Sequence, residues 1–194
     1  MKRIFDILAS SIIILIFFPF GIIISLLIFF TSKGGVFFIQ QRIGKNQKEF
    51  GLVKFRTMKS YSEKEGSLTV GKDSRITKVG SFLRQYKLDE FPQFLNVLFG
   101  QMSIVGPRPE VEEFVDLYTE EQLEILKVKP GITDLASLEY FDENAILGKT
   151  DNPRKVYIEE IMPAKIKLNK KYLDDPTIIN DLKIMWRTFV KIIA

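Results

Sequence analysis

Two adjacent carboxylates, Asp89 and Glu90, lie in the part of the sequence that is best suited to chemistry. Arg84 and Lys87 precede this acidic pair, and Arg108 follows it between two prolines. A carboxylate can act as a nucleophile or as a metal ligand, and arginine holds phosphate oxygens in a planar fork. Acids beside fixed cations therefore indicate phosphoryl chemistry.

The same acidic pair also has a purely structural interpretation. Asp89 and Glu90 lie just before Pro92, and acids followed by a proline are typical of a helix start, where carboxylates lie near the positive end of the helix dipole. Neighbouring helical residues diverge by about 100°, so the two carboxylates need not share a task. At the level of these residues both interpretations stay open.

The composition excludes several classes of site, because the 194 residues include no histidine and no cysteine. Ser-His-Asp and Cys-His mechanisms are impossible, no disulfide can form, and zinc sites of the usual kind are not expected. Catalytic groups must come from Asp, Glu, Lys, Tyr, Ser or Thr, and a metal would be oxygen-liganded, with Mg²⁺ the default. The net charge of +4 suits anionic lipid, phosphorylated substrates or nucleic acid.

The N-terminal segment is apolar enough to enter a membrane. No charged residue occurs from Ile7 to Ser32. This run is long enough to cross a bilayer, for which about 20 apolar residues suffice, and it is too long for a signal peptide. Pro19 predicts a kink or break, and both flanks are basic, so charge gives no orientation. Two interpretations stay open: a kinked spanning helix, and a re-entrant helix that turns at Pro19 and leaves on the face it entered.

A small β-hairpin is expected to carry part of the positive charge. Strand-like residues at 36–40 and 50–55 flank a turn signal at 44–46. Period-two alternation then places Lys54 and Arg56 on one face of the hairpin. The alternative is a solvated edge that is kept basic to deter strand pairing.

The rest of the chain is predicted to be mainly helical. Residues 59–75 are polar and predict a loop, residues 103–110 predict a rigid extended segment, and Pro130-Gly131 predicts a turn. Thr133 and Ser137, after that turn, could line a pocket or be ordinary turn and surface residues. Apolar spacing predicts helices at 79–91 (capped by Thr77 or Ser81), 92–98 (ending at Gly100), 110–127, 152–172 and 177–194. The last helix combines basic and large apolar residues, which suits a helix lying in a membrane interface or one packed on the core.

These motifs resemble the bacterial sugar transferase family, the monotopic phosphoglycosyl transferases, and specifically its small PglC-type members. The resemblance covers nearly the whole chain. It includes the apolar N-terminal segment with its proline, KFRTM at 54–58, KLDEFPQFLNVLFGQMSIVGPRP at 87–109 and KPGITDLA at 129–136. The block that ends at Pro109 is long and ungapped, so it is far more specific than a lone Asp-Glu pair.

The resemblance implies an activity. Members of this family transfer a sugar 1-phosphate from a UDP-sugar to polyprenyl phosphate such as undecaprenyl phosphate, and they release UMP in the first membrane step of glycan and polysaccharide assembly. The Asp of the family's dyad is the nucleophile of a ping-pong mechanism with a covalent phosphosugar intermediate. By this resemblance the catalytic residues are Asp89, the nucleophile, and Glu90, its partner.

The resemblance also implies a cofactor and a location. The family uses Mg²⁺, for which Asp89 and Glu90 are the candidate ligands, and Glu90 is alternatively a group that handles the acceptor's proton. Its apolar segment is a re-entrant helix, and its active site faces the cytoplasm at the bacterial inner membrane. Two departures are visible: Phe18 replaces the serine that often precedes the proline, and Asp134-Leu135-Ala136-Ser137 replaces Gly-Leu-Ala-Gln. The second departure adjoins the expected sugar pocket, so the sugar itself is not carried over.

Elementary chemistry agrees with this activity. A carboxylate is ionised near neutral pH and needs no base to attack phosphorus, which explains how the chain manages without histidine. Repulsion from the anionic diphosphate is offset by Mg²⁺ and by nearby cations. The candidate residues for binding phosphate or substrate are Arg108, Lys54, Arg56, Arg75, Arg84, Thr133 and Ser137.

The expected fold is α+β and mainly helical: a monotopic membrane protein with a re-entrant helix over residues 1–32 and a catalytic domain over residues 33–194. The expected partners are a UDP-sugar, polyprenyl phosphate and the lipid bilayer, with a homodimer left open and nucleic acid not expected, because no nucleic-acid motif is present. Two rival functions remain: a non-catalytic basic module that binds membrane surfaces, and a Mg²⁺-dependent hydrolase of nucleotide-sugars.

Overall fold

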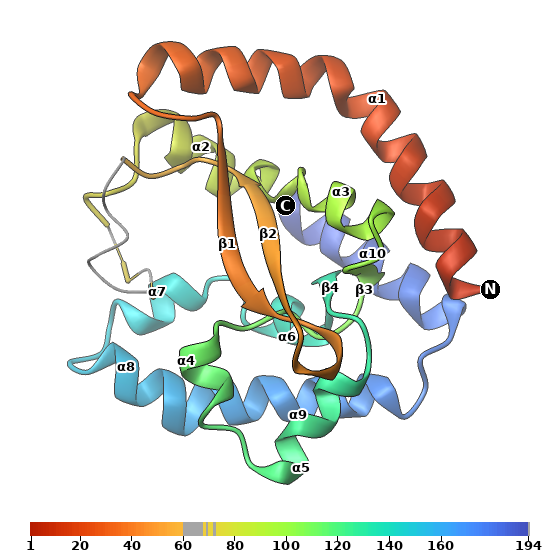
Figure 1. Ribbon diagram of the computed structural model, residues 1–194. Helices are drawn as coiled ribbons and strands as arrows, with labels where there is room; N and C mark the ends of the chain where they lie inside the picture. The colour runs from red at the N-terminus through yellow and green to blue at the C-terminus, as the bar shows by residue number, and fades with distance from the viewer. Residues whose placement is uncertain (60–67, 69, 72, 194) are drawn as a thin grey trace.

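The computed structural model describes residues 1–59, 68, 70–71 and 73–193, and this part of the chain is mainly helical (Figure 1). The predicted loop over 59–75 falls largely outside the described residues. A long N-terminal helix curves around one side of the molecule, a β-hairpin lies beneath it, and the helices of the C-terminal third close the opposite side.

Helix α1 (Lys2–Thr31) is the element that could enter a membrane. Among the described residues it is the one helix that is long and apolar enough to cross a bilayer, by length and composition. The predicted break at Pro19 is not seen, because the helix continues through the proline. Figure 1 shows instead that α1 bends between its two ends. A proline inside a helix removes one backbone hydrogen bond and is a usual cause of such a bend.

Polar contacts fix the N-terminal end of α1 to the rest of the chain. Lys2 forms an ion pair with the buried Asp181 of α10 (Ile178–Ile193). Arg3 donates to the backbone oxygens of Val97 (2.6 Å) and Leu98 (2.9 Å) at the end of α3 (Gln93–Leu98). These carbonyl groups belong to the last turn of α3, where a helix lacks intrahelical donors. Arg3 of α1 therefore provides hydrogen-bond donors for the C-terminal end of α3.

Buried contacts continue along α1. Asp6 is 3% exposed and accepts hydrogen bonds from Ser103 Oγ (2.8 Å) and from the backbone N of Ile104 (3.1 Å). At the other end of the helix, Ile28 is buried against Phe55 and Leu83. Both ends of α1 therefore pack against the same body.

The predicted hairpin is confirmed and is longer than expected. Strands β1 (Phe37–Ile43) and β2 (Glu49–Phe55) pair antiparallel with Phe37 opposite Phe55 and Ile43 opposite Glu49. The turn between them is the single 3₁₀ turn η1 (Lys45–Gln47), in which Asn46 has a positive φ of 56°. The buried residues of β2 are Phe50, Leu52 and Phe55, so burial alternates with period two only in the first half of the strand.

The segment that carries the acidic pair differs from the prediction of one helix over 79–91. Helix α2 (Lys78–Gln85) is capped by Thr77 Oγ1, which accepts from Gly80 N at 2.9 Å, and it ends before the acids. Asp89 and Glu90 lie on the separate 3₁₀ turn η3 (Leu88–Glu90). Helix α3 then follows Pro92, and Gly100 ends that region with a φ of 83°, as predicted.

A second, parallel sheet replaces the turn that was predicted at Pro130-Gly131. Strand β3 (Ser103–Val105) pairs with β4 (Gly131–Thr133), with Ser103 opposite Gly131. A Cβ atom at Gly131 would lie 2.1 Å from the backbone N of Gly106, so only glycine allows the two segments to approach this closely. Gly131 is therefore required by the close packing of two strands and not by the turn that was predicted.

The prediction of one charged helix over 110–127 is wrong. The segment forms α4 (Glu112–Val115), α5 (Glu120–Leu123) and the 3₁₀ turn η4 (Glu124–Lys127). The break comes at Thr119, whose side chain accepts from Gln122 N while the Gln122 side chain accepts from Thr119 N. This capping box starts a new helix in the middle of an apolar pattern that looked continuous.

Two short helices that were not predicted, α6 (Leu135–Glu139) and α7 (Glu143–Leu147), follow β4. The two predicted C-terminal helices agree with the structure in their main extent. The predicted 152–172 helix consists of α8 (Pro153–Val156), the π-helical turn η5 (Tyr157–Ile161) and α9 (Met162–Leu173), and α10 is close to the predicted 177–194. Buried side chains such as Leu52, Met102 and Ile184 join β2, the β3 region and α10 in one cluster.

Candidate active site

The turn that carries the acidic pair is held in an unusual backbone conformation. Lys87, just before η3, has φ 54° and ψ 19°, which is the left-handed region that residues other than glycine seldom adopt. This sharp reversal separates the acids from α2. It directs them toward β2, which packs against η3.

Glu90 is tied to two cations. Arg108 donates to both carboxylate oxygens of Glu90, with Nη1 to Oε2 at 3.0 Å and Nη2 to Oε1. Lys54 Nζ lies 3.7 Å from the same Oε1. Burial alone would raise the pKa of Glu90, but Arg108 and Lys54 outweigh it and hold this pKa well below its usual range. Glu90 is therefore a fixed anion whose oxygens are already engaged.

Asp89 has the opposite character. Its side chain is buried, with 7% exposed, and its Oδ1 has no hydrogen-bond partner among the described residues. Burial and the neighbouring charge of Glu90 raise the pKa of Asp89, against the opposing effect of Lys54 and Arg84. A buried polar atom without a partner is costly, so the position of Oδ1 indicates a group that is kept available for a ligand or a reaction.

Arg108 is placed by its surroundings as well as by Glu90. Its backbone N donates to Asp134 Oδ2 at 3.1 Å, and Nη1 reaches the backbone oxygen of Ile132 at 3.4 Å. Asp134 also caps α6 by accepting from Ser137 N at 2.5 Å. Asp134, one of the residues at which this sequence departs from the family pattern, thus fixes the backbone of the site's central arginine.

Lys54 comes from β2, and its charge is perturbed by its location. Burial lowers the pKa of Lys54 to about 8, although the Glu90 carboxylate works against the shift. The strand itself is held by Asn96 of α3, whose Oδ1 accepts from Val53 N at 3.0 Å and whose Nδ2 donates to Gly51 O at 2.8 Å. This side chain explains one of the polar interruptions in the apolar run after Pro92.

Arg84 is the third cation that acts on the acids. Its Nε donates to Thr57 Oγ1 at 2.9 Å, and its charge favours the ionised form of Asp89. Burial lowers the pKa of Arg84 itself. The structure therefore brings Asp89, Glu90, Arg108, Lys54 and Arg84 together around one turn.

The other predicted residues lie elsewhere. Arg56 donates from Nη2 to the backbone oxygen and the Oγ of Ser32 at 2.9 and 3.0 Å, beyond the end of α1. The expected shared face for Lys54 and Arg56 is thus not formed, because β2 ends at Phe55. Arg75 is held in a forked ion pair with Asp73.

The two predicted hydroxyl residues differ in their surroundings. Thr133 is buried, and its Oγ1 lies 2.6 Å from Thr188 Oγ1 of α10. Ser137 lies in the first turn of α6, and its backbone N donates a hydrogen bond to Asp134 Oδ1. Thr133 thus joins β4 to the last helix, and Ser137 remains a partly exposed side chain close to the residue that positions Arg108.

One aromatic residue near the site was missed by sequence reasoning. Lys87 Nζ lies 4.9 Å from the ring centroid of Phe141, and Lys191 Nζ lies 5.7 Å from the same centroid. Phe141 therefore joins the turn before the acids to the last helix through cation–π contacts. No spacing in the sequence relates these residues, since they come from segments far apart in the chain.

The arrangement suits attack on a phosphorylated substrate. It offers one buried carboxylate with an unengaged oxygen, a second carboxylate that holds two cations in place, and a third cation beside the first acid. As a test for a divalent metal, the described residues contain no group of three or more acidic or imidazole ligands. Mg²⁺ commonly binds through one or two carboxylates and substrate phosphates, so Asp89 and Glu90 fit it only as part of a substrate complex.

Comparison with known proteins agrees over the full length of the chain. The model of the family described as bacterial sugar transferase matches residues 1–194. A UDP-glucose:undecaprenyl-phosphate glucose-1-phosphate transferase of Klebsiella pneumoniae is 40% identical over 195 residues, covering 98% of this chain and 39% of that protein. The exopolysaccharide production protein ExoY of Rhizobium meliloti is 33% identical, covering 96% and 83%.

A third relative is close to this chain in length. A protein of Bacillus subtilis named as the uncharacterized sugar transferase EpsL is 36% identical over 195 residues, which cover all of this chain and 88% of that protein. The chain thus spans less than half of the Klebsiella relative but most of ExoY and EpsL. A family match over all 194 residues, with identities of 33–40% to these three relatives, shows common descent: the chain belongs to the bacterial sugar transferase family.

Proposed function

We propose that this protein transfers a sugar 1-phosphate from a UDP-sugar to polyprenyl phosphate and releases UMP, as an early membrane step of polysaccharide assembly. The names of its relatives support the substrate classes, since the Klebsiella and Aeromonas hydrophila relatives are named as transferases that act on undecaprenyl phosphate and UDP-sugars. The observation that carries the proposal is the buried, unengaged Oδ1 of Asp89 among three cations.

The reaction runs in two steps with Asp89 as the nucleophile. A carboxylate oxygen of Asp89 attacks the β-phosphorus of the UDP-sugar, the bond between this phosphorus and the bridging oxygen breaks, and UMP leaves with the electron pair. A phosphate oxygen of the polyprenyl phosphate then attacks the phosphorus of the acyl phosphate. The bond to Asp89 breaks, and the carboxylate is restored as the polyprenyl-diphosphate sugar departs.

The other charged residues assist by stabilising negative charge. Arg108 and Lys54 are held by their contacts with Glu90, so both cations are in place before a diphosphate binds. No reorganisation of these side chains is then needed when negative charge develops on the leaving UMP. Arg84 favours the ionised form of Asp89 that the attack requires. Glu90 acts mainly by holding these cations, and it therefore is the positioning partner of the nucleophile.

Mg²⁺ is proposed as the cofactor, held by Asp89 or Glu90 together with the substrate's phosphate oxygens. When bound, the ion would neutralise part of the diphosphate charge and of the charge on the leaving UMP. The support is the oxygen-donor chemistry of the Asp89 and Glu90 carboxylates, because Mg²⁺ commonly binds through one or two carboxylates together with substrate phosphates.

A re-entrant, monotopic placement on the cytoplasmic face of the bacterial inner membrane is proposed for the whole protein. A straight 30-residue helix is about 45 Å long, more than the roughly 30 Å of a bilayer's hydrocarbon core. Lys2 and Arg3 at one end of α1 and Ile28 at the other nevertheless pack on the same body. A helix that crossed the bilayer would separate these ends, so the bend in α1 supports entry and return on one side.

The last helix adds a second membrane contact to this proposal. Leu182, Trp186 and Phe189 of α10 are exposed at 48%, 65% and 53%. Large apolar side chains on a helix that also carries Lys183 and Arg187 suit the interface between headgroups and acyl chains. The acceptor's phosphate would then reach the site while its polyprenyl tail stays in lipid.

The deciding experiment is an isotope exchange without acceptor. Purified protein is incubated with labelled UMP and each of a panel of unlabelled UDP-sugars in the presence of Mg²⁺. A covalent phosphosugar intermediate predicts that label enters one UDP-sugar without polyprenyl phosphate, and that Asp89→Asn abolishes the exchange. Polyprenyl-dependent UMP release without any exchange would refute the two-step route, and UMP release without lipid over many turnovers would favour a hydrolase.

A further inference from the structure

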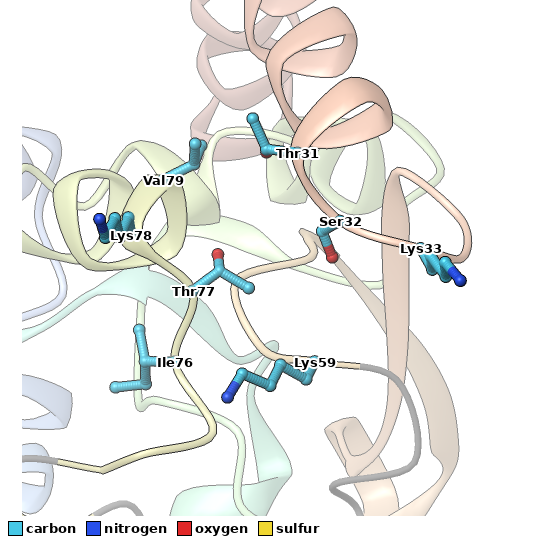
Figure 2. A pocket seen from close by; sticks show the side chains of 8 residues that line it. All are labelled: Thr31, Ser32, Lys33, Lys59, Ile76, Thr77, Lys78 and Val79. Carbon is cyan, nitrogen blue, oxygen red and sulfur yellow. The ribbon is translucent and has the colours of Figure 1, made fainter.

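A cavity lies at the point where the apolar helix α1 meets the polar body of the molecule. Its volume is about 760 Å³, which is within the range of pockets that hold small ligands. Figure 2 shows that its walls come from the end of α1 and the two residues after it, from Lys59 in the segment after β2, and from the residues that lead into and begin α2. The described lining residues are Thr31, Ser32, Lys33, Lys59, Ile76, Thr77, Lys78 and Val79.

The chemistry of this cavity is divided between its wall and its rim. Ile76 and Val79 give it an aliphatic wall, and its hydroxyl groups come from neighbouring Ser and Thr residues. Lys33, Lys59 and Lys78 are exposed and extend at its edge (Figure 2). A cavity with an aliphatic wall and a cationic rim is complementary to a molecule that carries both an apolar part and a negative charge.

The surroundings place this cavity at the level of lipid headgroups. Phe29 and Phe30, just before the lining residue Thr31, are 63% and 78% exposed. On α2, Lys78 is followed at four-residue spacing by Phe82 and Tyr86, which are 56% and 39% exposed and whose rings lie 5.1 Å apart. Positions four apart lie on one face of a helix, so this face runs from a cation at the cavity to aromatic side chains that suit the membrane interface.

We propose that this cavity binds the headgroup and glycerol region of an anionic phospholipid of the bilayer. The three lysines take the phosphodiester charge, the aliphatic wall takes the start of the acyl chains, and the bound lipid holds the end of α1 at the membrane surface. The cavity is distinct from the proposed catalytic turn, which is the turn η3 that carries Asp89 and Glu90. Neither these acids nor Arg108 and Lys54 belong to its described lining. A phosphate bound here is therefore a structural ligand and not the acceptor of the transfer reaction.

The test is lipid binding to the full-length protein in detergent, measured by native mass spectrometry. Phosphatidylglycerol and phosphatidylcholine with identical acyl chains are titrated separately against wild type, against Lys33→Gln/Lys59→Gln/Lys78→Gln, and against a control triple variant. The control is Lys48→Gln/Lys149→Gln/Lys171→Gln, which removes three exposed lysines outside the described lining. Circular dichroism and thermal unfolding in detergent confirm that each variant is folded.

Wild type should bind one phosphatidylglycerol more tightly than phosphatidylcholine. The cavity variant should weaken that binding by at least tenfold, since each lysine near an anionic headgroup contributes about fivefold, whereas the control variant should bind as wild type does. Lys78→Gln alone, should the triple variant unfold, is expected to show about a fivefold loss. Equal binding of the two lipids by wild type, or equal loss in the two triple variants, would overturn the proposal.

Two further titrations distinguish the sources of phosphate. Inorganic phosphate at millimolar concentration should not displace phosphatidylglycerol, because it lacks the apolar part that the aliphatic wall contacts. A polyprenyl phosphate should bind to the cavity variant as tightly as to wild type, because its site is the catalytic turn. Displacement by inorganic phosphate, or a selective loss of polyprenyl phosphate binding in the cavity variant, would show that the cavity serves another ligand.

Discussion

Arg108 engages both carboxylate oxygens of Glu90, whereas Oδ1 of the adjacent Asp89 has no partner among the described residues. Two neighbouring acids are thereby given different tasks by their contacts alone. Opposite pKa shifts follow, because cations surround Glu90 while burial and the charge of Glu90 act on Asp89. Such a divergence between paired acids is common where one of them takes part in the chemistry.

Under the proposed mechanism, replacement of Asp89 should be far more damaging than replacement of Glu90. Asp89→Asn is expected to reduce the rate of UMP release by about 10³-fold or more, because the covalent step is lost. Glu90→Gln should cost about 10–100-fold, since Arg108 and Lys54 remain but are less well fixed. Steady-state rates on the same UDP-sugar measure both, and equal losses in the two variants would contradict the division of roles.

Arg108→Lys should impair the site although the charge is kept. A lysine cannot form the forked contact to both oxygens of Glu90, so we expect roughly a 10–100-fold loss of kcat/KM with little change in stability. Arg154→Lys is the matched control, because Arg154 forms an exposed ion pair with Glu113 in which the side chains are 55% and 42% exposed. An exposed pair contributes little, and a comparable loss in that control would point to a general effect of arginine replacement.

The pH dependence of kcat/KM should reflect the loss of the proton from Lys54. Its pKa is lowered to about 8, so the protonated, cationic form prevails below that pH and is lost as the pH rises through it. The kcat/KM profile, which reflects the free enzyme, is therefore expected to fall on the alkaline side with an apparent pKa near 8. In Lys54→Arg the fall should move to higher pH, because arginine stays charged; an unchanged alkaline limb would assign it to another group.

Replacement of Gly131 should strongly destabilise the folded protein. Gly131→Ala places a Cβ 2.1 Å from Gly106 N, so β3 and β4 must move apart, at a cost of about 3 kcal/mol or more in the free energy of unfolding. For a chain of this size, each kcal/mol of lost stability lowers the midpoint of thermal unfolding by about 2–4 °C. The midpoint measured in detergent should therefore fall by roughly 6–12 °C. Gly35→Ala is the control, since its Cβ would meet only Phe37 O at an ordinary 3.7 Å.

Cysteine labelling can establish the topology of α1, because the natural chain has no cysteine to interfere. With Lys2→Cys and Lys33→Cys, a membrane-impermeant thiol reagent should label neither in intact cells and both after permeabilisation. Lys149→Cys, on the body of the protein, provides the reference. Labelling of only one of the two α1 positions from outside would mean that the helix spans the bilayer.

Local signals in the sequence were sufficient for elements that depend on their own residues. The hairpin, the Thr77 cap and the stop at Gly100 were predicted because strand alternation, capping hydroxyls and left-handed glycines act over a few residues. Pro19 predicted either a kink or a break in α1, and the structure shows that the helix continues through it.

Features that depend on distant segments were not predictable in the same way. Gly131 looked like a turn residue because its partner Gly106 is 25 positions away. The capping box of Thr119 and Gln122 is a local signal that was missed, because the apolar spacing across it looked continuous. The same limit applies to the site. The cluster of Lys54, Glu90 and Arg108 required three separate segments to meet, whereas Arg56, only two residues from Lys54, turned out to hold the end of α1.

The way in which α1 is bonded to the body bears on how this protein can be handled. Arg3 covers the carbonyl end of α3, Asp6 satisfies Ser103 and Ile104 in β3, and Lys2 neutralises the buried Asp181. Deleting the apolar segment to obtain a soluble fragment would remove all of these contacts at once: the buried Asp181 would lose its cation, and Ser103 and Ile104 would lose their acceptor Asp6. The segment is an internal part of the folding unit and not a detachable anchor, so biochemical work on this protein has to begin in detergent or lipid.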